Sequence, residues 1–141
     1  MKWTLSDYIS ITIHQTDLAL TGYIKEKLSD YNLAPEQNLI MMLLWEQNGL
    51  TQNEISQKLN KDKTNVARMA YNLEKKGFIQ RVHTAGDKRS LKLSLTEKGH
   101  NLGELVIPIA EEFHKMVTSG LTDKEITELR RLLSIIHRNV E

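Results

Sequence analysis

The apolar residues of the N-terminal stretch recur at helical spacing and predict one long helix from about residue 5 to residue 31. Asn32-Leu33-Ala34-Pro35 interrupts this pattern, and Pro35 suits the first turn of a second helix, which Asn48-Gly49 ends. We expect the inner face of the second helix to be formed by Leu39, Met42 and Leu43.

Two shorter helices with N-terminal caps are predicted next. Thr51-Gln52-Asn53-Glu54 fits a capping box, and the helix that it opens should bury Ile55 and Leu59. Asp62 is placed to cap a further helix, over about residues 63–76, which Gly77 can end in the left-handed conformation. The buried stripe of this helix is predicted to be Val66, Met69, Ala70 and Leu73. Its outward residues are then Thr64, Asn65, Arg68 and Asn72.

After Gly77 the apolar period changes from helical to twofold, which predicts two antiparallel strands. Ile79 and Val82 belong to the first strand, and the second contains Leu91, Leu93 and Leu95. We expect residues 83–90 to form the connecting loop, with turn residues at Gly86-Asp87. Lys88 and Arg89 give this hairpin a basic tip.

Two more helices are predicted at the C-terminal end. Thr96 can cap a helix that reaches roughly to Thr118, and residues 122–125 form a second capping box. The last helix is apolar over a wide arc, more than one contact face of a small monomer requires. Its apolar residues are Ile126, Leu129, Leu132, Leu133, Ile135, Ile136 and Val140. An ordinary core within one chain is the alternative use of this face.

Charge is distributed unevenly along the chain. Residues 51–92 contain ten basic and four acidic side chains, a net charge of +6, so the rest of the chain carries −5 of the overall +1. A basic middle flanked by acidic ends suits a polyanion-binding face on a separate scaffold. Charge alone also leaves open a solvated, lysine-rich surface.

Composition excludes several classes of function. The absence of cysteine rules out a disulfide framework, a thiolate zinc site and a thiol-based oxidant sensor. We find no secretion signal and no apolar run of transmembrane length, so we expect a cytoplasmic protein without a membrane partner. G-x-S-x-G, dinucleotide-binding and Walker motifs are also missing, so we expect neither enzymatic activity nor a cofactor.

The predicted elements follow the order of a winged helix-turn-helix: a short helix, a tight turn, a helix with a polar outer face, and a basic hairpin. The predicted fold is therefore mainly α with a small β-hairpin wing, and double-stranded DNA is the expected partner. Thr64, Asn65 and Arg68 have side chains that read base edges in the major groove, and Lys63 suits a phosphate. Arg89, with Lys88 beside it, suits the minor groove.

On three segments the chain resembles the MarR family of transcriptional regulators. Asp87-Lys88-Arg89-Ser90 matches the family's Asp-x-Arg-Ser wing motif, and the flanking residues 73–79 and 91–99 also resemble family signatures. The resemblance implies that Asp87 braces Arg89, which enters the minor groove. It also implies a homodimer on a pseudo-palindromic operator, in which residues 33–99 bind DNA and residues 1–32 and 100–141 form the helical dimerisation region.

The family further implies a repressor that releases DNA when a small aromatic effector binds. His14 and Trp45 lie on segments that can line an effector cleft, although packing or surface positions are the alternative for both. The five histidines, together with Glu111, Glu112 and His114, leave a metal-responsive regulator of the same fold open, but no HxH or HExxH spacing appears. A protein-interaction module is the third alternative; it would be favoured by an apolar or acidic outer face on residues 63–72, which the sequence does not have.

Overall fold

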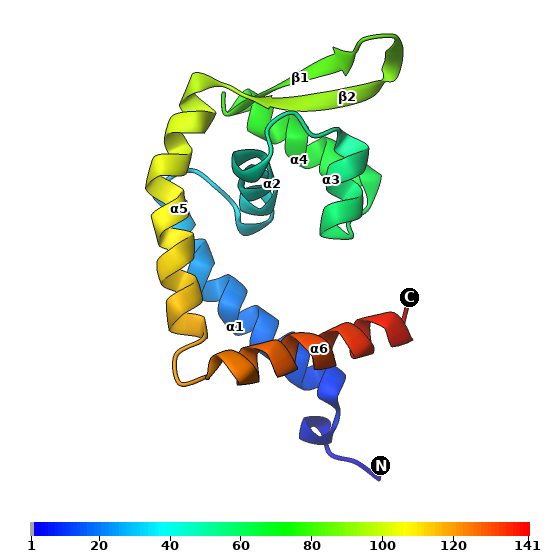
Figure 1. Ribbon diagram of the computed structural model, residues 1–141, viewed down its shortest axis with the longest axis vertical. Coiled ribbons are helices and arrows are strands. Elements are labelled where there is room, and N and C mark those ends of the chain that lie inside the picture. The colour runs from blue at the N-terminus through cyan, green and yellow to red at the C-terminus, as the bar shows by residue number, and fades with distance from the viewer. Residues whose placement is uncertain (1) are drawn as a thin grey trace. The chain divides into compact units, whose positions relative to one another are not determined.

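The computed structural model describes residues 2–141, except for the side chains of Asp87 and Lys88. The chain divides into two compact units, Met1–Ile109 and Ala110–Glu141. The elements (Figure 1) are a 3-10 turn η1 (Leu5–Asp7), α1 (Ile9–Ser29), α2 (Pro35–Glu46), α3 (Gln52–Leu59), α4 (Lys63–Lys75), β1 (Ile79–Thr84), β2 (Asp87–Leu95), α5 (Glu97–Val117) and α6 (Asp123–Asn139). Helix α5 begins in the first unit and ends in the second. The predicted fold class, helices with one small hairpin, is confirmed.

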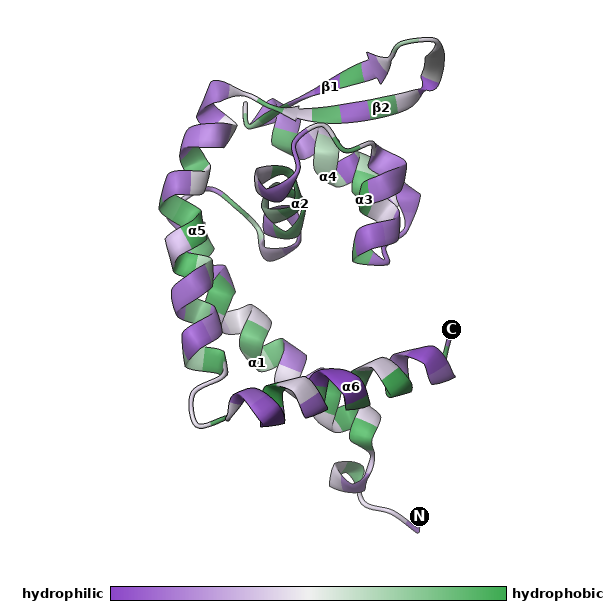
Figure 2. Ribbon diagram, in the orientation of Figure 1, coloured by the Kyte–Doolittle hydropathy of each residue, from purple (hydrophilic) through white to green (hydrophobic). Residues whose placement is uncertain are grey.

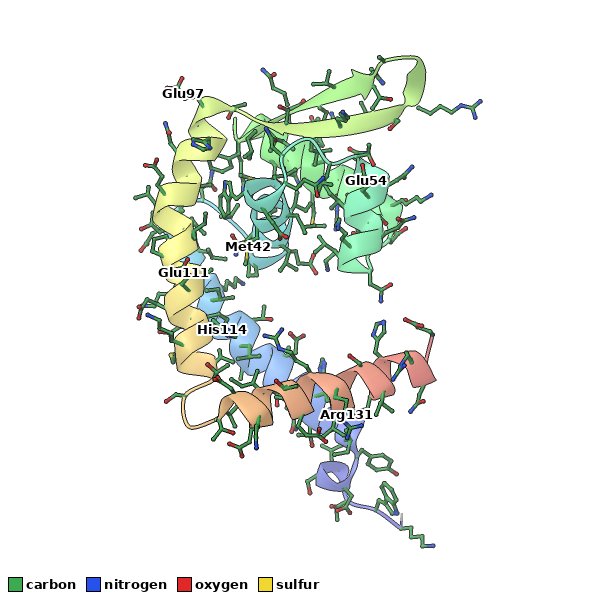
Figure 3. All side chains as sticks on the ribbon, in the orientation of Figure 1. Met42, Glu54, Glu97, Glu111, His114 and Arg131 are labelled. Carbon is green, nitrogen blue, oxygen red and sulfur yellow. The ribbon has the colours of Figure 1, made fainter. Side chains whose placement is uncertain are left out.

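Helix α2 begins at Pro35, as predicted, but the prediction of its inner face was wrong. Leu39 and Met42 are each 41% exposed, and Leu43 is only partly buried (Figure 3 shows Met42). The buried residues of α2 are Asn38, Ile40, Met41 and Leu44. Residues 39–45 are apolar without a break, so the sequence contains no polar face that fixes the rotation of the helix. Packing against α1, α3, α4 and β2 selects the face instead.

One hydrophobic core holds the first unit together. Fully buried side chains come from five helices: Leu28 of α1, Ile40 of α2, Ile55 of α3, Leu73 of α4 and Val106 of α5. Burial of each such side chain stabilises the fold by about 1.5–3 kcal/mol relative to an exposed position. The core therefore fixes α3 and α4 against the rest of this unit.

The predicted helix-turn-helix is confirmed, together with its caps. The hydroxyl of Thr51 accepts from the amide of Glu54 at 3.1 Å, and the Glu54 carboxylate accepts from the Thr51 amide at 3.1 Å. Asn60 ends α3 in the left-handed conformation, and Asp62 caps α4 by accepting from the Thr64 amide. All four residues of the predicted stripe on α4 are buried. Gly77 follows α4 with φ of +84°, the backbone conformation predicted for it.

The hairpin has longer strands and a tighter turn than predicted. Residues 83, 84 and 87–90, which we expected in a loop, belong to the strands, and the turn is Ala85-Gly86. Ile79 pairs with Leu95 and Arg81 with Leu93, and the register shifts between His83 and Thr84. The segment before α3 also pairs with β2, because the amide of Leu93 donates to Leu50 and Thr51 forms a bridge with Lys92. This backbone pairing ties the hairpin to the helix-turn-helix.

The start of α5 packs closely against Phe78 and Trp45. The hydroxyl of Thr96 accepts from the Gly99 amide at 3.0 Å, which confirms Thr96 as the cap of this helix. A Cβ atom on Gly99 would lie 2.0 Å from the carbonyl oxygen of Phe78, and one on Gly103 would lie 2.9 Å from the indole nitrogen of Trp45. Glycine is therefore needed at both positions for this packing.

Helix α6 is the main element of the second unit. Thr122 and Glu125 form the predicted capping box, with hydrogen bonds of 2.9 and 3.1 Å. Hydrophobic and hydrophilic residues alternate along the helix (Figure 2). No residue of α6, all of which the structure describes, is buried. Across the described residues, no helix combines the length and apolar character that a membrane span needs.

Candidate nucleic-acid interface

The outer face of α4 is polar and exposed to solvent. Lys63, Thr64, Asn65 and Arg68 are all exposed, and Asn72 is partly buried. The guanidinium of Arg68 donates to Oδ1 of Asn65 over 2.6 Å. This bond orients a flexible side chain along the helix surface, so that two groups suited to base edges lie next to each other.

Both ends of α4 are fixed to neighbouring elements. Before the helix, Lys61 donates to Glu36 of α2 at 3.1 Å. After it, the ammonium group of Lys76 donates to the Asn32 carbonyl at 2.8 Å and to Gln37 at 2.7 Å. Partial burial lowers the pKa of Lys76, because water no longer fully solvates the charge. These contacts hold the outer face of α4 in one orientation within its unit.

An ion pair joins α4 to the root of the hairpin. The Glu74 carboxylate accepts from the Arg81 backbone amide at 2.8 Å and from its guanidinium at 3.1 Å. The backbone hydrogen bond, followed by the guanidinium, lowers the pKa of Glu74. The pair is partly buried, with side-chain exposures of 25% for Arg81 and 35% for Glu74. The Glu74 carboxylate therefore helps to fix the orientation of β1 relative to α4.

The predicted wing residues lie at the far end of this hairpin. Arg89 is exposed and lies in β2, where the register is irregular. The brace from Asp87 to Arg89 and the position of the Lys88 side chain lie outside the described residues. Beside the middle of β2, Glu54 of α3 (Figure 3) has a lowered pKa, first because the Thr51 amide donates to it and further because Lys58 and Lys92 are near.

Two residues of the outer face of α4 were missed by the sequence reasoning. Tyr71 is 48% exposed, and Lys75 is exposed as well. Both continue the row that begins with Thr64 and Arg68, because these positions are spaced by four, three and four residues. The same helical spacing that we used for the buried stripe predicts this exposed row.

The two effector candidates lie in different surroundings. His14 is exposed on α1. Trp45 packs against the core, and its indole N–H donates to the Gly99 carbonyl at 3.0 Å. Through these contacts Trp45 helps to pack α5 against α2.

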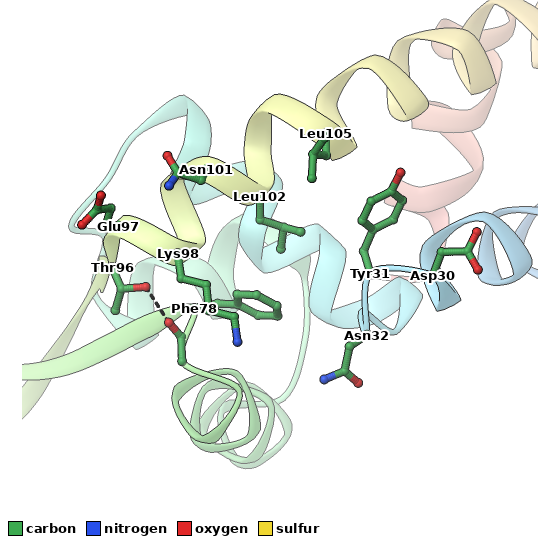
Figure 4. Close-up of a pocket in the computed structure, with 11 residues that line it drawn as sticks. Asp30, Tyr31, Asn32, Phe78, Thr96, Glu97, Lys98, Asn101, Leu102 and Leu105 are labelled. Carbon is green, nitrogen blue, oxygen red and sulfur yellow. Dashed lines mark hydrogen bonds between the residues drawn. The ribbon is translucent and has the colours of Figure 1, made fainter.

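An open crevice of about 820 Å³ is lined by neither candidate. Its apolar wall includes Phe78, Leu102 and Leu105, and Tyr31 lies at one end (Figure 4). The ammonium group of Lys98 lies 5.0 Å from the centre of the Phe78 ring and donates to the Lys76 carbonyl at 2.8 Å. The crevice thus combines an aromatic wall with one cation, and the carboxylates of Asp30 and Glu97 also line it.

Glu111 and His114 both lie on α5 (Figure 3). Glu112 is paired with Lys115 at 3.6 Å. Among the residues that the structure describes, no group of three or more His, Asp or Glu side chains is arranged to hold a metal ion.

Comparison with known proteins extends these observations. The model of the MarR family matches residues 33–91. The chain is 29% identical over 123 residues to the HTH-type transcriptional regulator YybA of Bacillus subtilis (strain 168), covering 87% of this chain and 82% of that protein.

Two solved structures of regulators bound to DNA are similar in fold. A MarR family transcriptional regulator from Listeria monocytogenes, complexed with a 26-mer DNA, superposes with a TM-score of 0.82 at 29% identity, over 99% of this chain and 90% of that one. The S. aureus MepR–DNA complex superposes with a TM-score of 0.88 at 26% identity, over 95% and 99% of the two chains.

The capped helix-turn-helix, the polar outer face of α4 and the adjoining hairpin together define a winged helix-turn-helix protein. With the family match, residues 33–91 form a domain of the MarR family. The relatives and solved structures to which the chain is similar are transcriptional regulators and not enzymes.

Proposed function

We propose that this regulator is a ligand-responsive repressor that binds a pseudo-palindromic DNA operator as a homodimer. The observation that carries the proposal is the exposed face of α4, where Asn65 holds the Arg68 guanidinium at 2.6 Å on a helix that is fixed at both ends. A rigid helix with exposed polar side chains fits the major groove, and a fixed orientation lowers the entropic cost of binding.

Each predicted side chain has a role in this proposal. Arg68 donates to the edge of a guanine, and Thr64 and Asn65 contact neighbouring base edges. Lys63, in the first turn of α4, contacts a phosphate, because a compact ammonium group suits a single oxygen. Arg89 enters the minor groove beside this contact. Asp87 braces Arg89, the role that the family motif gives to the aspartate, and Lys88 adds a second cation at the hairpin tip.

The exposed apolar face of α6 supports a homodimer. Leu129, Leu132, Leu133 and Ile136 are 38–47% exposed, and they recur at the spacing of one helix face. A contiguous apolar face of this kind on a regulator is best covered by the same face of a second copy. Two-fold symmetry then places two α4 helices about one DNA turn apart, which requires an operator with matching half-sites.

The crevice beside Phe78 supports a response to a small aromatic effector. Its aromatic and aliphatic wall suits a planar ligand, and the cation of Lys98 suits an acidic or phenolic group on that ligand. Because Phe78 directly follows α4 and Gly77, a ligand here can favour one position of α4 over another. Repression follows when the DNA-bound state covers a promoter and the ligand-bound state leaves it.

Electrophoretic mobility shift with the DNA upstream of the regulator's own gene, repeated over a range of salt, tests the proposal. We expect log K to fall by about 0.9 per phosphate neutralised as log salt rises. Arg68→Ala should cost about 1–3 kcal/mol at the operator and relax base preference, whereas Lys63→Ala should weaken all DNA binding more evenly.

Two matched controls lie on the polar face of α6. Arg131 donates to Glu128 three residues earlier, as Arg68 does to Asn65, and Lys124 lies in the first turn of its helix, as Lys63 does (Figure 3 shows Arg131). Arg131→Ala and Lys124→Ala should leave DNA binding unchanged. Equal losses in the α4 and α6 variants would contradict the assignment of α4 as the reading helix.

A further inference from the structure

A tyrosine with two cations close to its ring lies on the outer face of α4, next to the hairpin. The ammonium group of Lys75 lies 5.4 Å from the centre of the Tyr71 ring, and the guanidinium carbon of Arg81 lies 5.5 Å from it. Tyr71 and Lys75 come from α4 and Arg81 from β1. We call these three residues the wing-root cluster.

The wing-root cluster continues the row of residues proposed to read DNA. Thr64, Arg68, Tyr71 and Lys75 share one face of α4, opposite the buried stripe of Val66, Met69, Ala70 and Leu73. A ligand that lies along this face meets all four residues of the row. The cluster is therefore at the interface if α4 binds DNA as proposed.

Distance along the helix decides what the cluster can contact. Lys75 is eleven residues after Thr64, or about 17 Å along the axis at 1.5 Å per residue. The major groove is about 12 Å wide, and recognition helices contact bases through their N-terminal residues. With Thr64 and Arg68 over the bases, Tyr71 and Lys75 are beyond the groove floor, where phosphates lie.

The chemistry of the cluster matches a phosphate. Tyr71 offers a phenolic O–H and Lys75 an ammonium group, and both are donors that contact DNA backbones. The carboxylate of Glu74, the acidic neighbour, already accepts from Arg81, so the local charge is positive overall. Half-exposure of the Tyr71 ring leaves its polar end accessible to solvent and ligand.

We infer that Tyr71 and Lys75 form a DNA-phosphate site at the root of the wing, which contacts the backbone strand flanking the groove that Arg68 reads. The site adds affinity without sequence preference and fixes the position of α4 along the duplex. This inference rests on the proposed function of α4.

The chain supplies a matched control for the test. On α1, the ammonium group of Lys27 lies 5.7 Å from the centre of the Tyr23 ring, so this pair has the same residue types, the same four-residue spacing and a ring of 41% exposure. Tyr71→Phe, Lys75→Ala, Tyr23→Phe and Lys27→Ala are compared by fluorescence anisotropy on a mixed-sequence duplex of about 30 base pairs, long enough for two half-sites. Each titration is repeated over a range of salt.

Lys75→Ala should reduce the slope of log K against log salt by about 1.8, because the homodimer loses two phosphate contacts at about 0.9 each. Tyr71→Phe should weaken binding about tenfold for each subunit with the slope unchanged, because it removes a neutral donor to a charged acceptor. Tyr23 and Lys27 lie in the expected dimerisation region, so analytical ultracentrifugation first checks that their variants dimerise as the wild type does. Lys27→Ala and Tyr23→Phe should then match the wild type in both quantities.

Arg68→Ala on a selected operator separates failure of the inference from failure of the proposed function. If Arg68→Ala relaxes base preference while the Tyr71 and Lys75 variants keep wild-type affinity and slope, the phosphate site is refuted and the function stands. Equal effects in the α1 and α4 pairs also refute it. If the wild type itself shows no salt-dependent DNA binding, both the site and the proposed function are refuted.

Discussion

Helices α4 and α6 are both amphipathic, and they differ in what covers the apolar side. On α4, Val66, Met69, Ala70 and Leu73 are buried against the core of the first unit. On α6 the apolar residues Leu129, Leu132, Leu133 and Ile136 stay 38–47% exposed. Helical periodicity therefore identifies an apolar face in both helices, but it does not say whether the chain itself or a second chain covers that face.

The largest effect should come from truncation of the covered face. Leu73→Ala removes a fully buried side chain and should lower the free energy of unfolding by about 3 kcal/mol, measured by urea denaturation. Leu133→Ala on α6, measured at concentrations where the chain is monomeric, should lower it by less than about 1 kcal/mol. Similar losses in the two variants would show that α6 is covered within its own chain.

A charged side chain on the exposed apolar face of α6 should weaken the proposed dimer. Leu133→Glu places a carboxylate in the proposed dimer interface and should weaken dimerisation by about 2 kcal/mol, or about thirtyfold in the dissociation constant. Analytical ultracentrifugation over a dilution series measures this change. Lys124→Gln, which makes the same change of one charge unit on the polar side of the same helix, is the control for a change of charge away from that face. A wild-type chain that stays monomeric throughout the series would contradict the dimer.

Removal of the two capping boxes should have smaller and unequal effects. Thr51→Ala removes the acceptor for the Glu54 amide at the start of α3 and should cost about 1 kcal/mol in unfolding of the first unit. Thr122→Ala removes the equivalent acceptor for Glu125 and should mainly affect dimerisation. Circular dichroism melting and a dilution series on the same samples distinguish the two. Equal changes in melting and in dimerisation for both variants would contradict the proposal that α3 supports the core of the first unit and α6 the dimer.

The smallest change in the free energy of unfolding is expected for the ion pairs. The pKa of Glu74 is below its ordinary value of 4.5, because the Arg81 amide and guanidinium favour the carboxylate. This stabilisation is present above pH 4.5 and is lost as pH falls through the lower pKa of the folded state. Wild type and Glu74→Gln should therefore differ most in unfolding free energy near neutral pH and converge in acid. Glu128→Gln, from the exposed Glu128–Arg131 pair, should show the same dependence on pH with a smaller difference, because solvent screens that pair.

Local signals made most of the fold predictable. Thr51, Asp62, Thr96 and Thr122 all cap the helices that they were expected to cap. Capping depends on residues within one turn, so sequence contains the whole interaction. The buried stripe of α4 was predictable for a similar reason, because polar residues on its other face fix the rotation.

Interactions over long sequence separations were not predictable. The prediction of the inner face of α2 was wrong because residues 39–45 have no polar position that fixes the rotation of the helix. Pairing of Leu50 and Thr51 with β2 joins segments about 40 residues apart and leaves no periodic signal. The packing of Trp45 against Gly99 and Gly103 likewise depends on a contact between two helices. Tyr71, by contrast, was missed although the helical row predicts it.

Selection of binding sequences from a random DNA pool tests the central claim most directly, with wild type and Arg68→Ala run in parallel. We predict that the wild type enriches a two-fold symmetric sequence with half-sites about 10 base pairs apart, and that Arg68→Ala loses preference at one symmetric pair of positions. An unchanged sequence preference in Arg68→Ala, or no enrichment by the wild type, would contradict the account of α4 as the helix that reads DNA.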